Sequence, residues 1–201
     1  NMKYIVNEFS QEKLGPFSIG KNIKFGMMEY MGYTSLSKSG DEEILETSAN
    51  DYKRQFNYWL SYSKPLVYSW HLLDYLGEET IDNIMHNYYE DWKFKHPYPE
   101  NFFPYFSKYS DKDLSWYTHD VFYETGYVDY SVCLKRGNAI FRNKGTLTLP
   151  FEVAFYNRRG DEISREWFEN VEDELKYQVP EGTRSVTIDP DKTLPDSNRP
   201  N

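Results

Sequence analysis

Apolar positions recur with helical spacing in the first part of this chain and with alternating spacing in the second part. The longest helical pattern covers residues 48–75, where Ser48 and Asp51 have the spacing of a capping box. Four polar residues form one stripe of this helix: Asn57, Ser61, Lys64 and Tyr68. Four large apolar residues lie on the opposite side: Trp59, Leu66, Trp70 and Leu73. We therefore expect the apolar side to pack against protein and this helix to be central to the fold.

Pro65 and Gly77 mark where this helical pattern weakens and where it ends. Pro65 has no N–H, so the Ser61 carbonyl loses its helical donor, and a kink or an open turn is expected there. Gly77 suits the left-handed residue that follows a helix. Further helices are predicted at residues 25–36, 78–92, 100–109 and 110–123. The first part of the chain is therefore predicted to be all-α.

Alternation after Gly126 predicts strands. The clearest strand pattern has five apolar residues on one side: Leu147, Leu149, Phe151, Val153 and Phe155. Turn residues at 157–161 separate it from further strands predicted at residues 163–167, 175–179 and 185–188, and the Pro-rich and Asp-rich end predicts an extended tail. The predicted fold class is α+β and multidomain, with a helical domain over residues 1–126 and a small antiparallel β-sandwich over residues 127–201.

Composition and charge exclude several classes of protein. Aromatic residues make up 18% and charged residues 27% of the 201 residues, which is unlike an intrinsically disordered chain. The net charge of −9 argues against a nucleic-acid partner, because a phosphate-binding face would have to form against this field. No apolar run approaches the roughly 18 residues of a membrane span, so none is predicted. The single cysteine, Cys133, has no partner within the chain for a disulfide.

No catalytic or metal motif stands out from residue chemistry alone. None of the four histidines lies four residues from another, the helical spacing at which two imidazoles bind one zinc ion: His71, His86, His96 and His119. The acidic pairs, among them Glu42 with Glu43, lie in predicted loops and helix starts, where carboxylates usually cap and face solvent. We therefore interpret these histidines and carboxylates as structural.

A series of short motifs resembles the carboxyl-terminal half of the catalytic domain in aminopeptidase-N-like zinc metallopeptidases. These are the gluzincins that include leukotriene-A hydrolase, and the resemblance is to bacterial members. It rests on order and spacing over residues 44–201. The motifs are ETSA at 46–49, NY at 57–58, YSKP at 62–65, LGEE at 76–79, FKHPYPENF at 94–102, DLSW at 113–116, IDP at 188–190 and LPDSN at 194–198.

The resemblance implies a catalytic role for Tyr62. It aligns with the family tyrosine whose phenol stabilises the oxyanion formed when zinc-bound water attacks the scissile carbonyl. Tyr58 and Lys64 are implied to line the substrate cavity. Pro65 stands where better-studied relatives have glycine. Without the resemblance, Tyr62 would be interpreted as a core tyrosine beside Tyr58 and Leu66.

The zinc-binding H-E-x-x-H motif of this family does not occur in the sequence. We therefore expect no cofactor in this chain, and expect zinc only in a full-length protein whose amino-terminal catalytic half supplies the ligands and the general base. The expected function is that of a carboxyl-terminal peptidase fragment, a hydrolase in the intact protein and inactive alone. Its expected partners are the missing half and a peptide substrate, and bacterial relatives suggest a periplasmic or extracytoplasmic location.

Two other functions remain open at this point. The chain could be a non-catalytic peptide-binding or protein-binding module that keeps the peptidase fold. Sugar binding through exposed Tyr and Trp is a third alternative, which rests on composition alone. An encoded H-E-x-x-H upstream of Lys3 favours the enzyme, whereas a native start at Met2 favours the module. A truncated catalytic domain would also expose apolar helix faces, so self-association is a further expectation.

Overall fold

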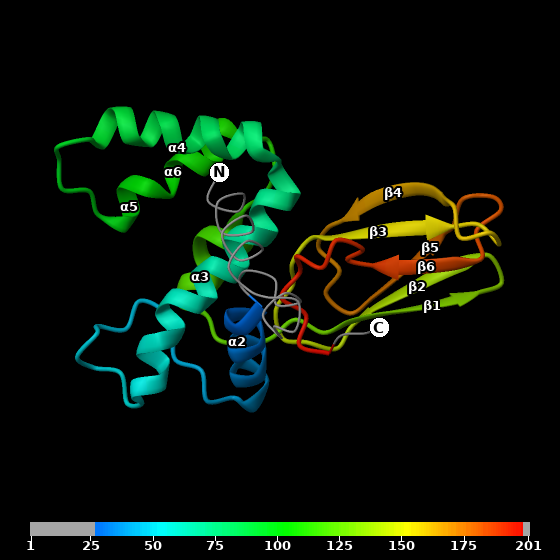
Figure 1. Cartoon of the computed structure of the whole chain (residues 1–201), viewed down its shortest axis with the longest axis horizontal. Helices are drawn as coiled ribbons and strands as arrows, with labels where there is room; N and C mark the ends of the chain where they lie inside the picture. Colours follow the sequence, from blue (N-terminus) through cyan, green and yellow to red (C-terminus); the bar gives the residue numbers. More distant parts are fainter. Residues whose placement is uncertain (1–26, 199–201) are drawn as a thin grey trace, which may run out of the picture.

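The computed structural model describes residues 27–198, so the first 26 residues of the predicted helical domain lie outside this account (Figure 1). The helical elements are α2 (Met27–Ser39), α3 (Gln55–Leu76), α4 (Glu78–Trp92), α5 (Pro99–Phe102), α6 (Pro104–Tyr109), the π-helical turn η2 (Trp116–Asp120) and α7 (Val121–Tyr123). The strands are β1 (Tyr130–Lys135), β2 (Asn138–Asn143), β3 (Phe151–Tyr156), β4 (Glu162–Phe168), β5 (Glu174–Gln178) and β6 (Ser185–Ile188). The predicted α+β class is confirmed at this coarse level.

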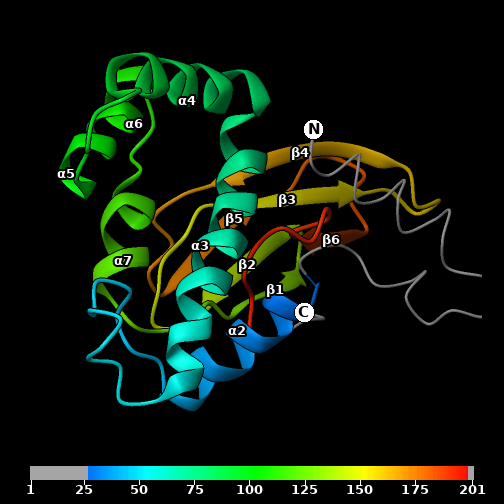
Figure 2. The ribbon, with the colours of Figure 1, turned by 60° about the vertical axis from the view of Figure 1, so that its left-hand side comes forward.

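Helix α3 is the central helix, as predicted, but it begins later than its capping pattern indicated. Ser48 and Asp51 form a turn instead, with the Asp51 N–H donating to the Ser48 carbonyl at 2.8 Å. The helix starts at Gln55, and it ends where predicted, because Gly77 has a positive φ of 81° and its N–H donates to the Leu73 carbonyl at 2.9 Å. In Figure 2, α2 runs beside the first half of α3, and α4 leaves from its far end.

The predicted orientation of α3 is wrong for its first half. The polar stripe is the buried side, because Asn57, Lys64 and Tyr68 are all buried. On the opposite side, Trp59 is 70% exposed. The reason lies outside the helix: α2 contributes Tyr33, whose hydroxyl lies 2.9 Å from that of Tyr68, and residues 41–46 contribute carboxylates. These partners satisfy polar side chains that a helix of this pattern would otherwise turn to solvent.

The second part of the chain forms two three-stranded antiparallel sheets, with strand orders β1-β2-β5 and β4-β3-β6. The three later predicted strands correspond to β4, β5 and β6. The strand predicted from the alternation of Leu147 to Phe155 begins only at Phe151, although Leu147 and Leu149 are buried as their alternation requires. They are held outside the ladder because the Tyr130 hydroxyl bonds both the N–H and the carbonyl of Leu149, at 3.1 and 3.0 Å.

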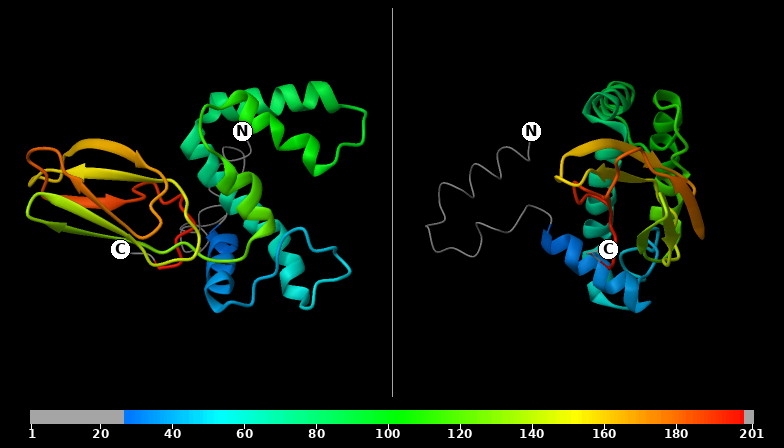
Figure 3. Two further views of the ribbon diagram at one scale, coloured as in Figure 1. Left: turned by 180° about the vertical axis from the view of Figure 1, so that it is seen from behind. Right: turned by 90° about the vertical axis from the view of Figure 1, so that its right-hand side faces the viewer.

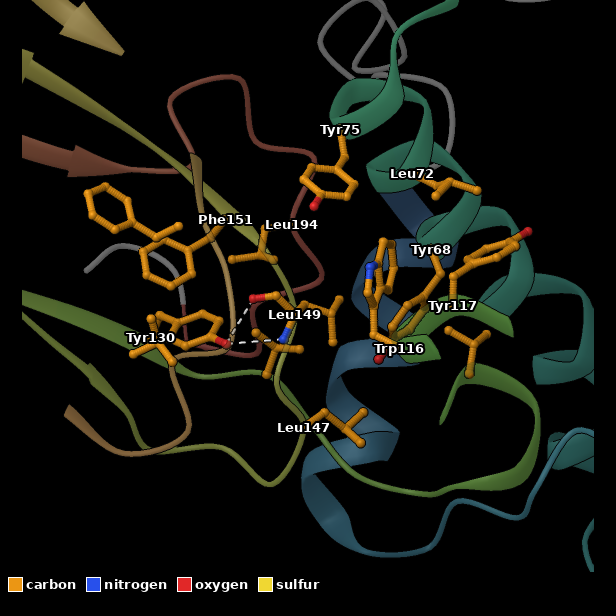
Figure 4. Close-up of a cluster of buried hydrophobic side chains, with 14 of the residues drawn as sticks. Tyr68, Leu72, Tyr75, Trp116, Tyr117, Tyr130, Leu147, Leu149, Phe151 and Leu194 are labelled. Atoms are coloured by element: carbon orange, nitrogen blue, oxygen red, sulfur yellow. Dashed lines mark hydrogen bonds between the residues drawn. The ribbon is translucent and has the colours of Figure 1, made fainter. Parts of the chain in front are cut away.

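One hydrophobic core runs through the helices and the sheets, which lie at opposite ends of the molecule (Figure 3). Figure 4 shows Trp116 and Tyr117 beside α3, with Tyr130 and Phe151 on the strand side. The Tyr130 and Phe151 rings are 4.3 Å apart. His71 of α3 bridges the two parts, since its Nε2 lies 2.8 Å from the Pro150 carbonyl. The division into two domains at residues 126 and 127 remains a prediction.

Within residues 27–198, no helix has both the length and the apolarity needed to cross a membrane.

Candidate functional site

Tyr62 lies on the solvent-facing side of α3. Its side chain is 66% exposed, so the interpretation as a core tyrosine is wrong. Its hydroxyl lies 3.3 Å from the hydroxyl of Tyr58, one helical turn earlier. The two rings meet edge to face, with centroids 5.8 Å apart and planes at 79°. The structure thus brings together two of the three residues that the sequence singled out.

The hydrogen bond with Tyr58 raises the pKa of the Tyr62 phenol above its ordinary value of 10, and the electrostatic effect of the Tyr58 phenol and partial desolvation raise it further. Near neutral pH, Tyr62 is therefore protonated. Either hydroxyl can donate in this pair. The raised pKa belongs to the arrangement in which Tyr62 donates to Tyr58. When Tyr58 donates instead, the O–H of Tyr62 is free to point at another acceptor, which is the property needed to stabilise a developing negative charge.

Large aromatic side chains continue around Tyr62 on the first half of α3. We call this set the α3 aromatic face, and its members are all exposed: Phe56, Tyr58, Trp59 and Tyr62. Side chains of this size are usually buried, and a group of them on one exposed surface is typical of a site that meets a ligand or another protein surface. Of the apolar side that the sequence predicted for α3, only Trp59 belongs to this face, and it is exposed instead of packed against protein.

Lys64 lies on the other side of α3 from the Tyr62 phenol. Its ammonium forms an ion pair with Glu42 at 2.7 Å, with side-chain exposures of 1% and 3%. Its Nζ also donates to the Glu124 carbonyl at 2.8 Å. Burial lowers the pKa of Lys64, and the charge of Glu42 opposes that effect. Lys64 is thus engaged inside the fold, while the cavity roles inferred for Tyr58 and Lys64 remain predictions.

Glu42, the partner of Lys64 in this ion pair, is the residue that the sequence interpretation missed. We expected Glu42 and Glu43 to cap and face solvent, yet Glu42 is almost fully buried. Its second oxygen, Oε2, accepts the N–H of Gly126 at 3.0 Å. No local pattern identifies it, because its partners lie 22 and 84 positions away along the chain. Only the pairing of a buried lysine with an unassigned acidic loop could have suggested it.

The described residues contain no group of three or more His, Cys, Asp or Glu side chains placed to hold a metal ion. His71 serves the core contact with Pro150, and His119 lies 3.1 Å from Asp120 on the surface. Between residues 27 and 198, the donor set of a zinc site is therefore not assembled.

A cavity of about 140 Å³ lies where α3 ends against the strands. Its lining includes Tyr75, Trp116 and several carboxylates, but not Tyr62. The carboxylates are partly engaged already: Glu169 accepts the Tyr75 hydroxyl, and Asp113 accepts the Ser115 N–H at 2.9 Å. This cavity is separate from the α3 aromatic face.

No sequence-family profile matches the chain, and no curated protein sequence matches it. Among solved structures, the chain is similar to the crystal structure of Legionella pneumophila aminopeptidase A in complex with aspartic acid. The similarity has a TM-score of 0.53 at 15% sequence identity and covers 72% of this chain. This chain spans only 18% of that protein. At this level of identity, the comparison shows a shared fold at a coarse level.

Proposed function

We propose that this chain is the carboxyl-terminal portion of an aminopeptidase-like zinc metallopeptidase, in which Tyr62 supplies an oxyanion-stabilising hydrogen bond. The observation that carries the proposal is the exposed, protonated phenol of Tyr62 within the YSKP motif, held at 3.3 Å from Tyr58. The fold similarity to an aminopeptidase supports it. The finer assignment, a gluzincin helical half followed by a β-sandwich, is part of this proposal.

The chemistry assigns a limited task to this chain. In such a peptidase the metal ion activates the attacking water. Its ligands and the general base would come from a part of the polypeptide that this chain does not contain. Tyr62 donates its O–H where negative charge develops on the substrate carbonyl oxygen. Removing one such donor typically costs about 3 kcal/mol of transition-state stabilisation.

The α3 aromatic face supports the same proposal. Trp59 and Phe56 are more than half exposed and lie about one and two helical turns before Tyr62. We propose that the amino-terminal catalytic half covers part of this face and leaves Tyr62 at the edge of a peptide-binding cavity. Helices α3 to α7 would then form one wall of that cavity.

The test uses a full-length protein that encodes H-E-x-x-H upstream of this segment. We expect Tyr62→Phe to lower kcat for aminoacyl reporters by about a hundredfold to a thousandfold with little change in KM, since the lost bond forms mainly in the transition state. Tyr127→Phe is the control, because Tyr127 follows α7 and its hydroxyl bonds the Lys144 carbonyl, outside the helices assigned to the cavity wall. Equal kcat values for Tyr62→Phe and the control would refute the catalytic role. The 201-residue chain alone should neither retain zinc after dialysis nor cleave these reporters.

The alternative is a non-catalytic module that binds peptide or protein through the α3 aromatic face. The exposure of four aromatic side chains on one helix favours it. The two proposals differ in what precedes the segment. A natural coding sequence without H-E-x-x-H, together with reporter-peptide binding that Trp59→Ala abolishes, would favour the module.

A further inference from the structure

The helical turn that carries Tyr62 is weakened by its own sequence. Pro65 lies inside α3 and has no N–H to donate to the Ser61 carbonyl four residues earlier. Helix interiors usually kink or open at such a position. Here α3 nevertheless continues from Gln55 to Leu76, so the open turn expected at Pro65 does not interrupt the helix.

Lys64, the residue before Pro65, makes contacts outside the helix at this turn. Its ammonium lies 2.7 Å from Glu42 Oε1 and 2.8 Å from the Glu124 carbonyl. Glu42 belongs to the segment that precedes α3, and Glu124 follows α7. Glu42 Oε2 also accepts the Gly126 N–H. The Lys64 side chain therefore connects the weakened turn to the segment before α3, through Glu42, and to the segment after α7, through Glu124.

A second tether lies two turns earlier, on the same buried side. The Asn57 amide donates to the Asp41 carbonyl at 3.2 Å and to the Glu43 carboxylate. Both tethers leave from the side of α3 opposite the Tyr58 and Tyr62 phenols. They therefore fix the rotation of the helix while the aromatic face stays open.

We propose that the buried Lys64–Glu42 pair positions the turn that presents Tyr62, which makes Lys64 a positioning residue. A buried ion pair is seldom the most stable solution, since a hydrophobic pair of similar volume is often as stable. In this helix the pair fixes the location of a turn that lacks one backbone hydrogen bond, the one that Pro65 cannot donate. Its catalytic consequence rests on the function proposed above, whereas its structural consequence can be measured in this chain alone.

The structural test is amide hydrogen exchange on the 201-residue chain. The double variant Glu42→Gln, Lys64→Met removes both charges and leaves no lone buried ion. We expect exchange to become at least tenfold faster at residues 60–66, with the protection of residues 70–75 unchanged. Pro65→Ala in the same background restores the missing backbone donor and should return the fast amides toward their original rates. A general role in stability would accelerate exchange along the whole helix, and Pro65→Ala would not correct it selectively.

Lys112→Met is the matched control, because Lys112 ties the other end of α3 through the Tyr75 carbonyl at 3.2 Å. It should affect exchange near residue 75 only. Unchanged exchange at residues 60–66 in the double variant, or no recovery with Pro65→Ala, would overturn the proposal. If the double variant does not fold, the triple variant Glu42→Gln, Lys64→Met, Pro65→Ala is compared with Pro65→Ala alone; equal rates at residues 60–66 support the proposal, and tenfold faster rates contradict it.

In a full-length peptidase, the double variant should lower kcat about tenfold at constant KM, with recovery by Pro65→Ala. A full-length protein without peptidase activity, but with the expected exchange pattern, would refute the proposed function and leave the positioning role intact. Normal activity in the double variant would refute only the proposed effect of the Lys64–Glu42 pair on catalysis.

Discussion

The hydroxyls of Tyr58 and Tyr62 lie 3.3 Å apart on the exposed side of α3, with their rings edge to face. This contact joins two residues one helical turn apart, so it needs no other element of the fold. It gives an exposed phenol a defined neighbour and a defined protonation state. The contact makes the proposed chemistry testable without substrate or metal.

Tyr58→Phe should lower the pKa of Tyr62 toward its ordinary value of 10, because the hydrogen bond that Tyr62 donates to the Tyr58 hydroxyl is the largest cause of its elevation. Carbon-13 labelling of the tyrosine Cζ atoms and NMR titration between pH 8 and 12 would measure this. Tyr89→Phe, on another helix, should leave the Tyr62 titration unchanged. An identical Tyr62 titration in Tyr58→Phe would show that the pair does not persist in solution.

Lys64→Met alone should destabilise the chain strongly, by about 3 kcal/mol or more, because Glu42 then remains buried without its counter-charge. Adding Glu42→Gln should recover most of that loss. Urea unfolding followed by circular dichroism gives both free energies and the coupling between the two positions. Additive effects of the two substitutions would mean that the residues do not act as a pair.

Gly126 is expected to tolerate no side chain. A Cβ there would lie 2.3 Å from Thr146 Oγ1 and 3.1 Å from a Leu147 side-chain carbon, and φ is +152°. Gly126→Ala should therefore lower the free energy of unfolding by about 1–3 kcal/mol. Gly32→Ala is the contrasting variant, because it lies within α2 with open space around it and should be neutral or stabilising by up to about 1 kcal/mol. Similar losses in both variants would argue against the close approach at Gly126.

Periodicity predicted the elements well where burial follows from local pattern. Phe151, Val153 and Phe155 alternate into the core as expected. On α3 the same reasoning failed, because which side is buried depends on partners from elsewhere in the chain. The polar side contacts Tyr33, Glu42 and Glu43, which come from other segments. The sequence of the helix alone does not predict these contacts. The position of Tyr62 came from a motif, whereas its exposure and its contact with Tyr58 required the structure.

Tyrosines whose pKa is raised in the folded chain predict a loss of stability at alkaline pH. Burial raises the pKa of Tyr68 and of Tyr130 well above 10, and a hydrogen bond to the Glu166 carboxylate raises the pKa of Tyr177 to about 12. Between about pH 10 and pH 12 the unfolded chain loses these protons while the folded chain keeps them. The free energy of unfolding is therefore unaffected by these groups below pH 10 and falls as the pH rises above it.

Tyrosinate absorbance at 295 nm, recorded together with urea unfolding at each pH, would measure this effect. The phenols of Tyr68 and Tyr130 should ionise only as the fold is lost. Tyr177→Phe should make the fall in stability less steep, since it removes one of the protons that the folded state retains. If all tyrosines ionised together near pH 10 with circular dichroism unchanged, the buried phenols would have to be accessible in the folded chain, and the core described around Tyr68 and Tyr130 would be wrong.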